Sequence, residues 1–462
     1  MVGAAPECEQ TAKAQAYAAR GSRFRNVPAA PGSHPRASGP EGAHRALDDG
    51  AAVSDPRAAC RRIRGNGTDG GRLMLRRAVD TRLGWRDVVD LVRRPSPILE
   101  CPGDPLARLG VLADELADGV GPIHFIGLSR YLDDARAVVT HSIDDTTRYV
   151  CTCLDTLDAY DIKATVFIST GAPEMGRLWP RLRKAVADGH ELGAHSRRHR
   201  CAARESLLFC IAAVSRYEVH GARRDILAHT QQPYVWTWAY PCGNCADRKF
   251  AQRMIALAGC VAARAYPGER DDAHLVPDLQ TYDPNPFAAR YTQVVQKGYH
   301  TEDGVRISGR TDVKALNAKF DEVYAAQGIY SFVSHPQMLD YGPDTFYERH
   351  LAHIGGRNDI WYVPMGPLYA YHMLCRHTSV VALKANDAQA RFAVFSRLDS
   401  RVYRNSVTLE FHATRQPRVT AGGKQLAERT TSMLDRWDGE YVRRAEQRLW
   451  LTIRPNTVVE FR

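Results

Sequence analysis

The chain has 462 residues, of which 44% are hydrophobic and 25% are charged, a globular balance with enough apolar residues for two or three domains. Its formal net charge is +10, but the basic residues are scattered among Ala, Gly and Pro with little aromatic interleaving, which argues against nucleic-acid binding. No run approaches the roughly 18 apolar residues of a membrane helix, so we expect no membrane span.

The first 130 residues have no predicted function. Residues 1–75 are rich in Ala, Gly, Pro and Arg and lack apolar periodicity, which is typical of a disordered or low-complexity tail. Residues 76–130 form a lead-in with two predicted helices, around residues 85–94 and 105–118.

From residue 131 to 376, short β-rich apolar runs alternate with segments of helical periodicity. The predicted strands are residues 135–140, 164–169, 191–195, 234–240, 260–265, 329–334 and 360–363. The predicted helices are residues 147–160, 178–187, 203–227, 246–258, 312–326, 344–354 and 367–376. About seven β/α units in series predict a parallel α/β domain, and a closed or nearly closed barrel fits them. In such barrels the chemistry lies where strands end and loops begin.

Residues 377–462 show a different pattern, in which short alternating runs are separated by turn signals such as Gly422-Gly423 and Pro455-Asn456. The predicted strands here are residues 391–396, 406–411, 418–421, 449–452 and 458–461. We therefore expect a small all-β, sandwich-like domain after the barrel.

Two adjacent carboxylates, Asp144 and Asp145, follow the first barrel strand. On an extended strand their side chains would diverge, but at the strand-to-loop turn both can face one cavity. One could then bind a metal while the other acts as a base. The alternative is a helix N-cap, because an Asp before Thr146-Thr147 suits a helix start.

The segment His195-Ser-Arg-Arg-His199 leads directly out of another strand. Histidines at i and i+4 lie on one face of a helical turn, so both imidazoles could reach one ion. The alternative is an exposed basic turn.

A third polar position, His335, ends the strand predicted at residues 329–334, where it could act as a general acid or be a structural histidine. Together these positions offer one Asp and two His as ligands. Three protein ligands on zinc leave a position for water, which is the arrangement of a hydrolytic metal.

Two other features are open to more than one interpretation. Cys242 and Cys245 form a Cys-x-x-Cys pair that could be redox-active or bind metal, although no second pair accompanies it. Four aromatic residues could form a sugar-stacking platform, namely Trp236, Trp238, Trp361 and Tyr240, but aromatic residues at alternating strand positions are more often core.

These motifs resemble the NodB-homology polysaccharide deacetylases, carbohydrate esterase family 4, over roughly residues 131–376. The family motif Thr-Phe-Asp-Asp-Gly resembles residues 142–146, and His-Ser/Thr-x-x-His is matched in full by residues 195–199. The motif Arg-x-Pro-x-Gly resembles residues 239–243, and the late histidine motif resembles residues 334–336. The resemblance implies a distorted (β/α) barrel, often with seven strands.

The resemblance also implies a role for each matched position. Asp145, His195 and His199 would hold a divalent metal, usually zinc, and Asp144 would be the general base that deprotonates the attacking water. The backbone N–H of Cys242 would help to stabilise the oxyanion. His335 would protonate the leaving amine, giving acetate and a free amine.

This sequence departs from the family pattern in the third motif, where Ala239 stands in place of an Arg that helps to orient the base. That leaves Asp144 without its usual partner, and the class of substrate is therefore not fixed by the motifs. Asp278 and Asp283 are candidates for carboxylates that contact the His335 side chain and support it.

The favoured hypothesis is a metal-dependent hydrolase that removes an N-acetyl group from an amino sugar or glycan. One alternative is an amidase of the same fold that acts on a small non-sugar amide or cyclic imide. Another is a non-catalytic carbohydrate-binding protein. The N-terminus lacks the apolar core of a signal peptide, so we expect a cytoplasmic location, and the sequence does not indicate an oligomeric state.

Overall fold

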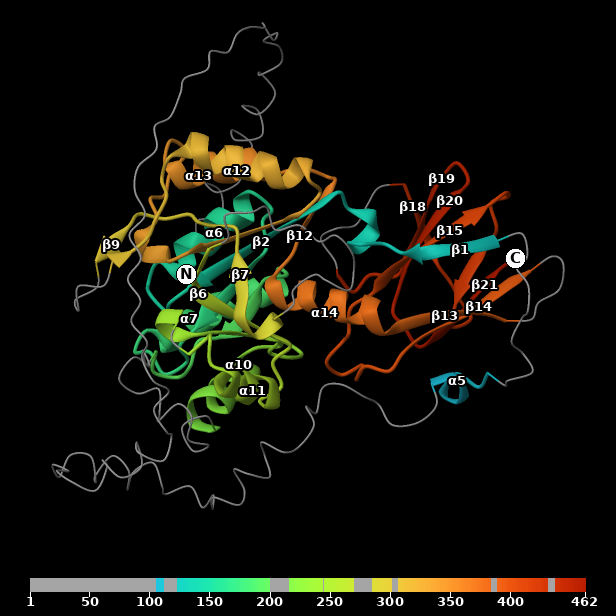
Figure 1. Ribbon diagram of the computed structural model, residues 1–462, viewed down its shortest axis with the longest axis horizontal. Coiled ribbons are helices and arrows are strands. Elements are labelled where there is room, and N and C mark those ends of the chain that lie inside the picture. Colours follow the sequence, from blue (N-terminus) through green and yellow to red (C-terminus); the bar gives the residue numbers. More distant parts are fainter. Residues whose placement is uncertain are drawn as a thin grey trace, which may run out of the picture. The chain divides into compact units, whose positions relative to one another are not determined.

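The computed structural model describes residues 105–111, 123–199, 216–243, 245–269, 285–300, 306–383, 389–430 and 437–462. It confirms the predicted fold class, because a nearly closed parallel barrel is followed by antiparallel β sheets (Figure 1). The tail predicted at residues 1–75, the helix predicted at 85–94 and residues 203–215 of the helix predicted at 203–227 lie outside the described residues. No helix in the described ranges is both long and apolar enough to span a membrane.

The barrel sheet contains nine short strands in the order β7-β6-β5-β4-β3-β2-β11-β8, with β12 also paired to β2, and all of its pairings are parallel. These strands are β2 (Ala137–Asp144), β3 (Ala164–Ile168), β4 (Glu191–Ala194), β5 (Thr237–Ala239), β6 (Ala262–Glu269), β7 (Ala289–Tyr291), β8 (Gln293–Val294), β11 (Ile329–Ser334) and β12 (Ile360–Tyr362).

One short segment joins the two ends of this sheet. β7 pairs with β6 at one end, and β8, which begins two residues after β7, pairs with β11 at the other. The backbone N–H of Thr292, between them, donates to Ser331 O at 2.6 Å. Counted as one strand, β7 and β8 complete a ring of seven, with β12 branching from β2. The seven strands predicted from the sequence include β12 but miss β7 and β8.

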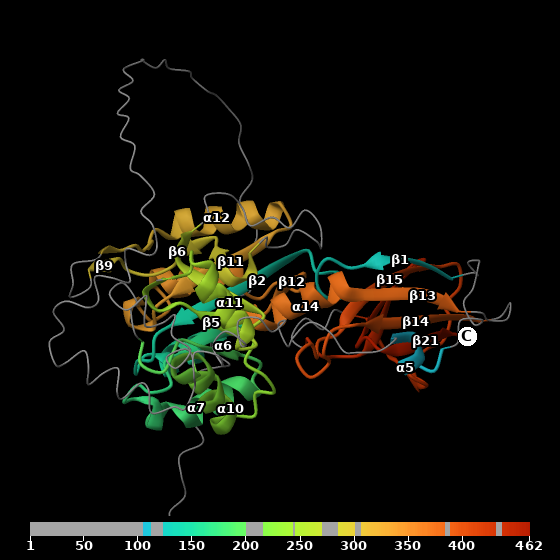
Figure 2. The ribbon, with the colours of Figure 1, turned by 60° about the horizontal axis from the view of Figure 1, so that its bottom comes forward.

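The barrel strands are buried on both faces, which explains why apolar and polar residues do not alternate strictly along them. Every residue of β2, β3 and β11 is buried. Helices cover the outside of the sheet (Figures 1 and 2). They are α6 (Val150–Ala159), α7 (Met175–Ala187), α10 (Gly221–His229), α11 (Lys249–Leu257), α12 (Val313–Ala325), α13 (Phe346–Ile354) and α14 (Met365–His377). A π-helical turn, Arg216–His220, precedes α10, and a short ladder pairs β9 (Tyr299–His300) with β10 (Arg306–Ile307).

The C-terminal region contains two five-stranded sheets. The first is β1 (Ile123–Leu128), β15 (Val407–Ala413), β20 (Arg448–Ile453), β19 (Tyr441–Ala445) and β18 (Ala427–Arg429). The second is β13 (Thr378–Leu383), β14 (Ala390–Ser396), β21 (Thr457–Phe461), β16 (Val419–Ala421) and β17 (Lys424–Gln425). The sequence predicted five of these ten strands, and those missed include the short, exposed β17 and β18.

Strand β1 comes from the lead-in before the barrel, yet it pairs antiparallel with β15. Apolar and polar residues alternate only weakly along β1, because its register with β15 shifts between Phe125 and Gly127. This explains why the sequence pattern did not indicate a strand. The helix predicted at residues 105–118 appears as α5 (Pro105–Arg108), and residues 112–118 lie outside the described ranges.

Helix α14 links the barrel to the C-terminal sheets. The buried Glu191 carboxylate at the start of β4 accepts hydrogen bonds from Thr165 Oγ1, Thr237 Oγ1 and the N–H of Gly366 in the first turn of the helix. A Cβ on Gly366 would lie 2.3 Å from Glu191 Oε1, so this close approach requires glycine.

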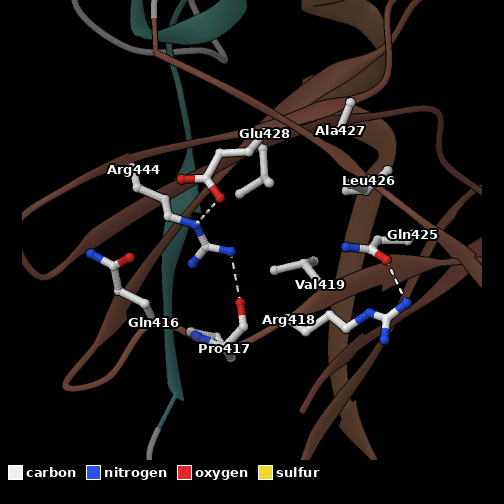
Figure 3. A pocket seen from close by; sticks show the side chains of 10 residues that line it. Gln416, Pro417, Arg418, Val419, Gln425, Leu426, Ala427, Glu428 and Arg444 are labelled. Carbon is white, nitrogen blue, oxygen red and sulfur yellow. Dashed lines mark hydrogen bonds and ion pairs between the residues drawn. The ribbon is translucent and has the colours of Figure 1, made fainter.

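The C-terminal sheets contain a cavity of about 620 Å³ between β16–β17 and β18–β19. Arg444 donates to the Pro417 carbonyl and forms an ion pair with Glu428, and Arg418 lies beside Gln425 (Figure 3). The residues that line the cavity include no aromatic side chain. It therefore lacks the flat surface on which a sugar ring could stack.

Candidate active site

The paired carboxylates lie at the carboxyl end of β2. Asp144 is the last residue of the strand and is buried, and Asp145 follows it with a left-handed φ of 73°. This turn of the backbone redirects the chain, so both carboxylates lie beside the same histidine, His335. The N-cap alternative is not realised, because α6 begins at Val150 with Tyr149 as its cap.

The segment from His195 to His199 follows β4 as a bent loop, not as the helical turn that the sequence predicted. Ser196 and His199 both have left-handed φ values, 64° and 48°. The loop nevertheless brings the two imidazole rings to a centroid distance of 4.7 Å. A non-glycine residue in this conformation costs on the order of 1 kcal/mol, which is typical of functional sites that the surrounding structure over-determines.

Two carboxylates from the following helical segment hold this loop. Glu218 Oε2 accepts hydrogen bonds from the backbone N–H groups of Arg197 and Arg198, at 2.8 and 3.1 Å. Asp225 on α10 forms a two-pronged ion pair with the Arg197 guanidinium. The basic residues between the histidines are therefore anchors for the loop as well as surface charge.

Asp145, His195 and His199 together could hold a metal ion. One donor atom from each lies within 4.8 Å of the other two, and Asp145 Oδ1 is 3.8 Å from His195 Nε2 and 3.1 Å from His199 Nε2. His195 Nδ1 lies 2.9 Å from the Ala239 carbonyl, which selects the tautomer with its proton on Nδ1 and leaves Nε2 as a ligand. Two imidazole nitrogens and one carboxylate oxygen fit zinc or a similar divalent metal.

The charges of the site suit two of these three donors, whereas for His199 burial is outweighed by the hydrogen bond with Asp145, which raises its pKa. Burial, followed by the neighbouring His199, lowers the pKa of His195 to about 4, so its imidazole is neutral near pH 7, as a ligand must be. Burial alone would raise the pKa of Asp145, but its hydrogen bond with His199 and the nearby histidines hold it well below its usual range. Asp145 is therefore ionised and available as a ligand.

His335 lies beyond the end of β11, facing both carboxylates. Its Nε2 is 4.0 Å from Asp144 Oδ2 and 4.0 Å from Asp145 Oδ2. Its Nδ1 lies 2.8 Å from Gln296 Oε1, which also accepts the backbone N–H of His335. The two residues expected to support His335, Asp278 and Asp283, lie outside the described residues. Among the described residues, the amide of Gln296 holds the ring.

Cys242 lies in a 3-10 turn, Pro241–Gly243, at the carboxyl end of β5, with a left-handed φ of 55°. Its sulfur takes part in a disulfide bond. The turn places the Cys242 backbone on the same edge of the barrel sheet as the other candidate residues, because all of the barrel strands are parallel.

Comparison with known proteins identifies the domain that carries this site. The family profile described as polysaccharide deacetylase matches residues 133–258. This domain belongs to the polysaccharide deacetylase family. The matched residues include both carboxylates, both loop histidines and Cys242. A search of curated proteins by sequence finds no match.

Several solved structures resemble part of this chain. A putative polysaccharide deacetylase from Mycobacterium smegmatis is 12% identical, covers 53% of this chain and 93% of its own, and has a TM-score of 0.38. A family 4 acetyl xylan esterase from Clostridium thermocellum, in complex with cobalt, is 16% identical, with coverages of 47% and 81% and a TM-score of 0.26. The PuuE allantoinase is 15% identical, with coverages of 59% and 97% and a TM-score of 0.37. None of these likenesses assigns an activity to this chain.

The deacetylase domain contains a buried ion pair that the sequence motifs did not reveal. Arg264 on β6 donates from Nη2 to Asp144 Oδ2. Burial would raise the pKa of Asp144, but the charges of Arg264, then His195 and His335, outweigh it and hold the pKa below its usual range. The only sequence signal was an Arg within an otherwise apolar run at residues 260–265.

Other side chains in contact with the site were also missed. Gln337 Nε2 donates to Asp145 Oδ2 at 2.9 Å, and the rings of Tyr266 and Tyr299 lie edge-on to His335 at centroid distances of 5.7 and 6.1 Å. The four aromatic residues considered as a sugar platform, by contrast, are all buried in the core. The aromatic side chains beside the site are therefore tyrosines from other strands.

Proposed function

We propose that this protein is a metal-dependent hydrolase that removes an N-acetyl group from an amino sugar or glycan. The observation that carries the proposal is the convergence of three metal-type donors, Asp145, His195 and His199, with Asp144 and His335 beside them. Membership of the deacetylase family supports the same chemistry.

A divalent metal, which we propose to be zinc, would supply Lewis acidity and make a water molecule easier to deprotonate. Asp144 accepts the proton of the water that attacks the acetyl carbon. Its Oδ1 is buried and has no hydrogen-bond partner among the described residues, so this oxygen is available to take the proton.

Attack on the carbonyl places negative charge on its oxygen, and the backbone N–H of Cys242 stabilises this charge in our proposal. The C–N bond then breaks as His335 gives a proton to the leaving nitrogen. His335 can do this while its Nδ1–H donates to Gln296, because a protonated imidazole carries a hydrogen on each nitrogen. The products are acetate and the free amine of the sugar.

The test combines elemental analysis with acetate release from a panel of N-acetylated sugars and small amides. We expect about one metal ion per chain, and chelation should abolish acetate release until metal is restored. His195→Ala together with His199→Ala should remove the metal and the activity. Asp144→Asn should keep the metal and lower kcat by about 100-fold or more.

His353→Ala is a matched control, because His353 lies on α13 and contacts Asp321 instead of the site. Its metal content and acetate release should equal those of the wild type. If the double histidine variant kept both metal and activity, the proposed function would be wrong. Hydrolysis of small amides without any acetylated sugar would instead favour an amidase.

A further inference from the structure

Arg264 lies opposite Ala239 across two neighbouring strands. In the parallel register of β5 and β6, the Cα atoms of these two residues are direct partners. Residues paired in this way project toward the same face of a sheet. A guanidinium that begins on β6 can therefore reach the space that an Arg at position 239 would occupy, and the small side chain of Ala239 leaves that space open.

The surroundings of Arg264 hold its side chain in one place. The side chain is only 2% exposed, and that of its partner Asp144 is 4% exposed. Its Nη1 donates to the Ala265 carbonyl at 3.2 Å, and the ring of Phe167 lies 5.4 Å from the guanidinium carbon. An Arg fork held by packing and by a second hydrogen bond is a rigid partner for a carboxylate.

The pairing is asymmetric in a way that suits a base. Arg264 contacts Oδ2 of Asp144, whereas Oδ1 has no hydrogen-bond partner among the described residues. The guanidinium thus fixes the rotation of the carboxylate and leaves one oxygen for the water.

We infer that Arg264 is a positioning residue for Asp144, and that it acts from β6 in place of the Arg that this chain lacks at position 239. The inference rests on the proposed function, because it assigns Asp144 the role of base. It explains how the site can keep an oriented base although its third motif lacks the usual Arg.

The experiment compares three variants by their kcat, KM, metal content and Tm. Two carry the single substitutions Arg264→Met and Arg264→Lys. The third, the exchange variant, combines Arg264→Ala with Ala239→Arg. Arg264→Met should lower kcat by on the order of 100-fold, because small misplacements of a reacting group have effects of this size, while KM and metal content stay near wild type. Arg264→Lys should retain part of the activity. The exchange variant should recover at least about tenfold in kcat over Arg264→Met.

Arg443→Met is a control for the loss of a buried ion pair. Arg443 pairs with the buried Asp133 and stacks over Trp450, away from the site. This variant should lower Tm but leave kcat unchanged, so a fall in kcat with Arg264→Met cannot be a general effect of instability. Tm and metal content of each variant are measured without substrate and show whether it is folded.

The outcomes separate the inference from the proposed function. If the metal-loaded wild type releases no acetate, the proposed function fails and the inference falls with it. If the wild type is active and Arg264→Met keeps its kcat, only the inference is wrong. If Arg264→Met does not fold, the other two variants decide. A wild-type kcat in Arg264→Lys overturns the inference. So does an exchange variant that folds but has no activity.

Discussion

Gly243 shows how one residue shapes the site. Its φ is 69°, and a Cβ at this position would lie 0.8 Å from the backbone carbonyl oxygen of Tyr266. The third motif therefore ends in glycine because the turn after β5 lies directly against β6. The neighbouring Cys242, whose N–H we assign to the oxyanion, depends on this contact for its position.

We predict that Gly243→Ala will lower both stability and acetate release, because the turn must move away from Tyr266. A suitable control is Gly356→Ala, since Gly356 has the same φ of 69° but a methyl group there would meet nothing within 4 Å. Gly356→Ala should lower the free energy of unfolding only by the added backbone strain, about 1 kcal/mol, and should leave kcat unchanged. Urea unfolding and kcat measure both effects, and equal losses in the two variants would contradict the steric explanation.

Glu191 links two secondary-structure elements, because its side chain joins β4 to the N-terminal turn of α14. Burial raises the pKa of this carboxyl group to about 6, although hydrogen bonds from Thr237, Gly366 and Thr165 oppose the shift. An acid whose pKa is higher in the folded state than in the unfolded state retains its proton on folding. Folding is therefore less favourable once the pH is high enough to ionise the group.

We predict that Glu191 contributes a fall of about 2 kcal/mol to the free energy of unfolding of the wild type as the pH rises from roughly 4 to 7. The stability is fully present below the unfolded pKa of 4.5 and is lost as the pH passes the folded value of about 6. Glu191→Gln should lack this fall, because an amide does not titrate. Urea unfolding of both metal-free proteins across this range tests the difference, and parallel pH curves would refute it.

At the scale of the whole molecule, one hydrophobic cluster joins the barrel to the C-terminal sheets. It includes Val138 of β2 and Leu368 of α14 together with Phe411 of β15 and Phe461 of β21. Trp236, just before β5, also donates from its indole N–H to the Val402 carbonyl at 2.8 Å. An interface of this apolar character couples the stability of the two parts.

We predict that Phe411→Ala, which empties a fully buried position between Phe392 and Phe461, destabilises the protein by about 3 kcal/mol or more. Because the parts are coupled, acetate release should be lost at the same lowered temperature as the circular-dichroism signal. Glu428→Ala, at an exposed position, is the control and should change neither temperature. If activity survived beyond the unfolding of the sheets, the two parts would be independent.

The alternation of apolar runs and helical periods along the chain was enough to predict the parallel barrel, the all-β region and the strand ends that carry Asp144, His195 and His335. These features are local, since a parallel strand buried on both faces is rich in apolar residues and polar side chains gather where it ends. Strands β1, β17 and β18 escaped prediction because they are short, irregular or exposed, and pairing with distant strands holds them in place.

The sequence by itself therefore determined the fold class and suggested the candidate site residues, because both follow from patterns within a few positions of one another. Only the tertiary structure decided how the site is supported. Arg264 meets Asp144 across 120 residues, and Gln296 meets His335 across 39. The register of β5 with β6 and the closure of the barrel bring these partners together, and neither can be read from local periodicity. The absence of an Arg at position 239 was visible in the sequence, whereas the Arg paired with that position became visible only once the strands were aligned.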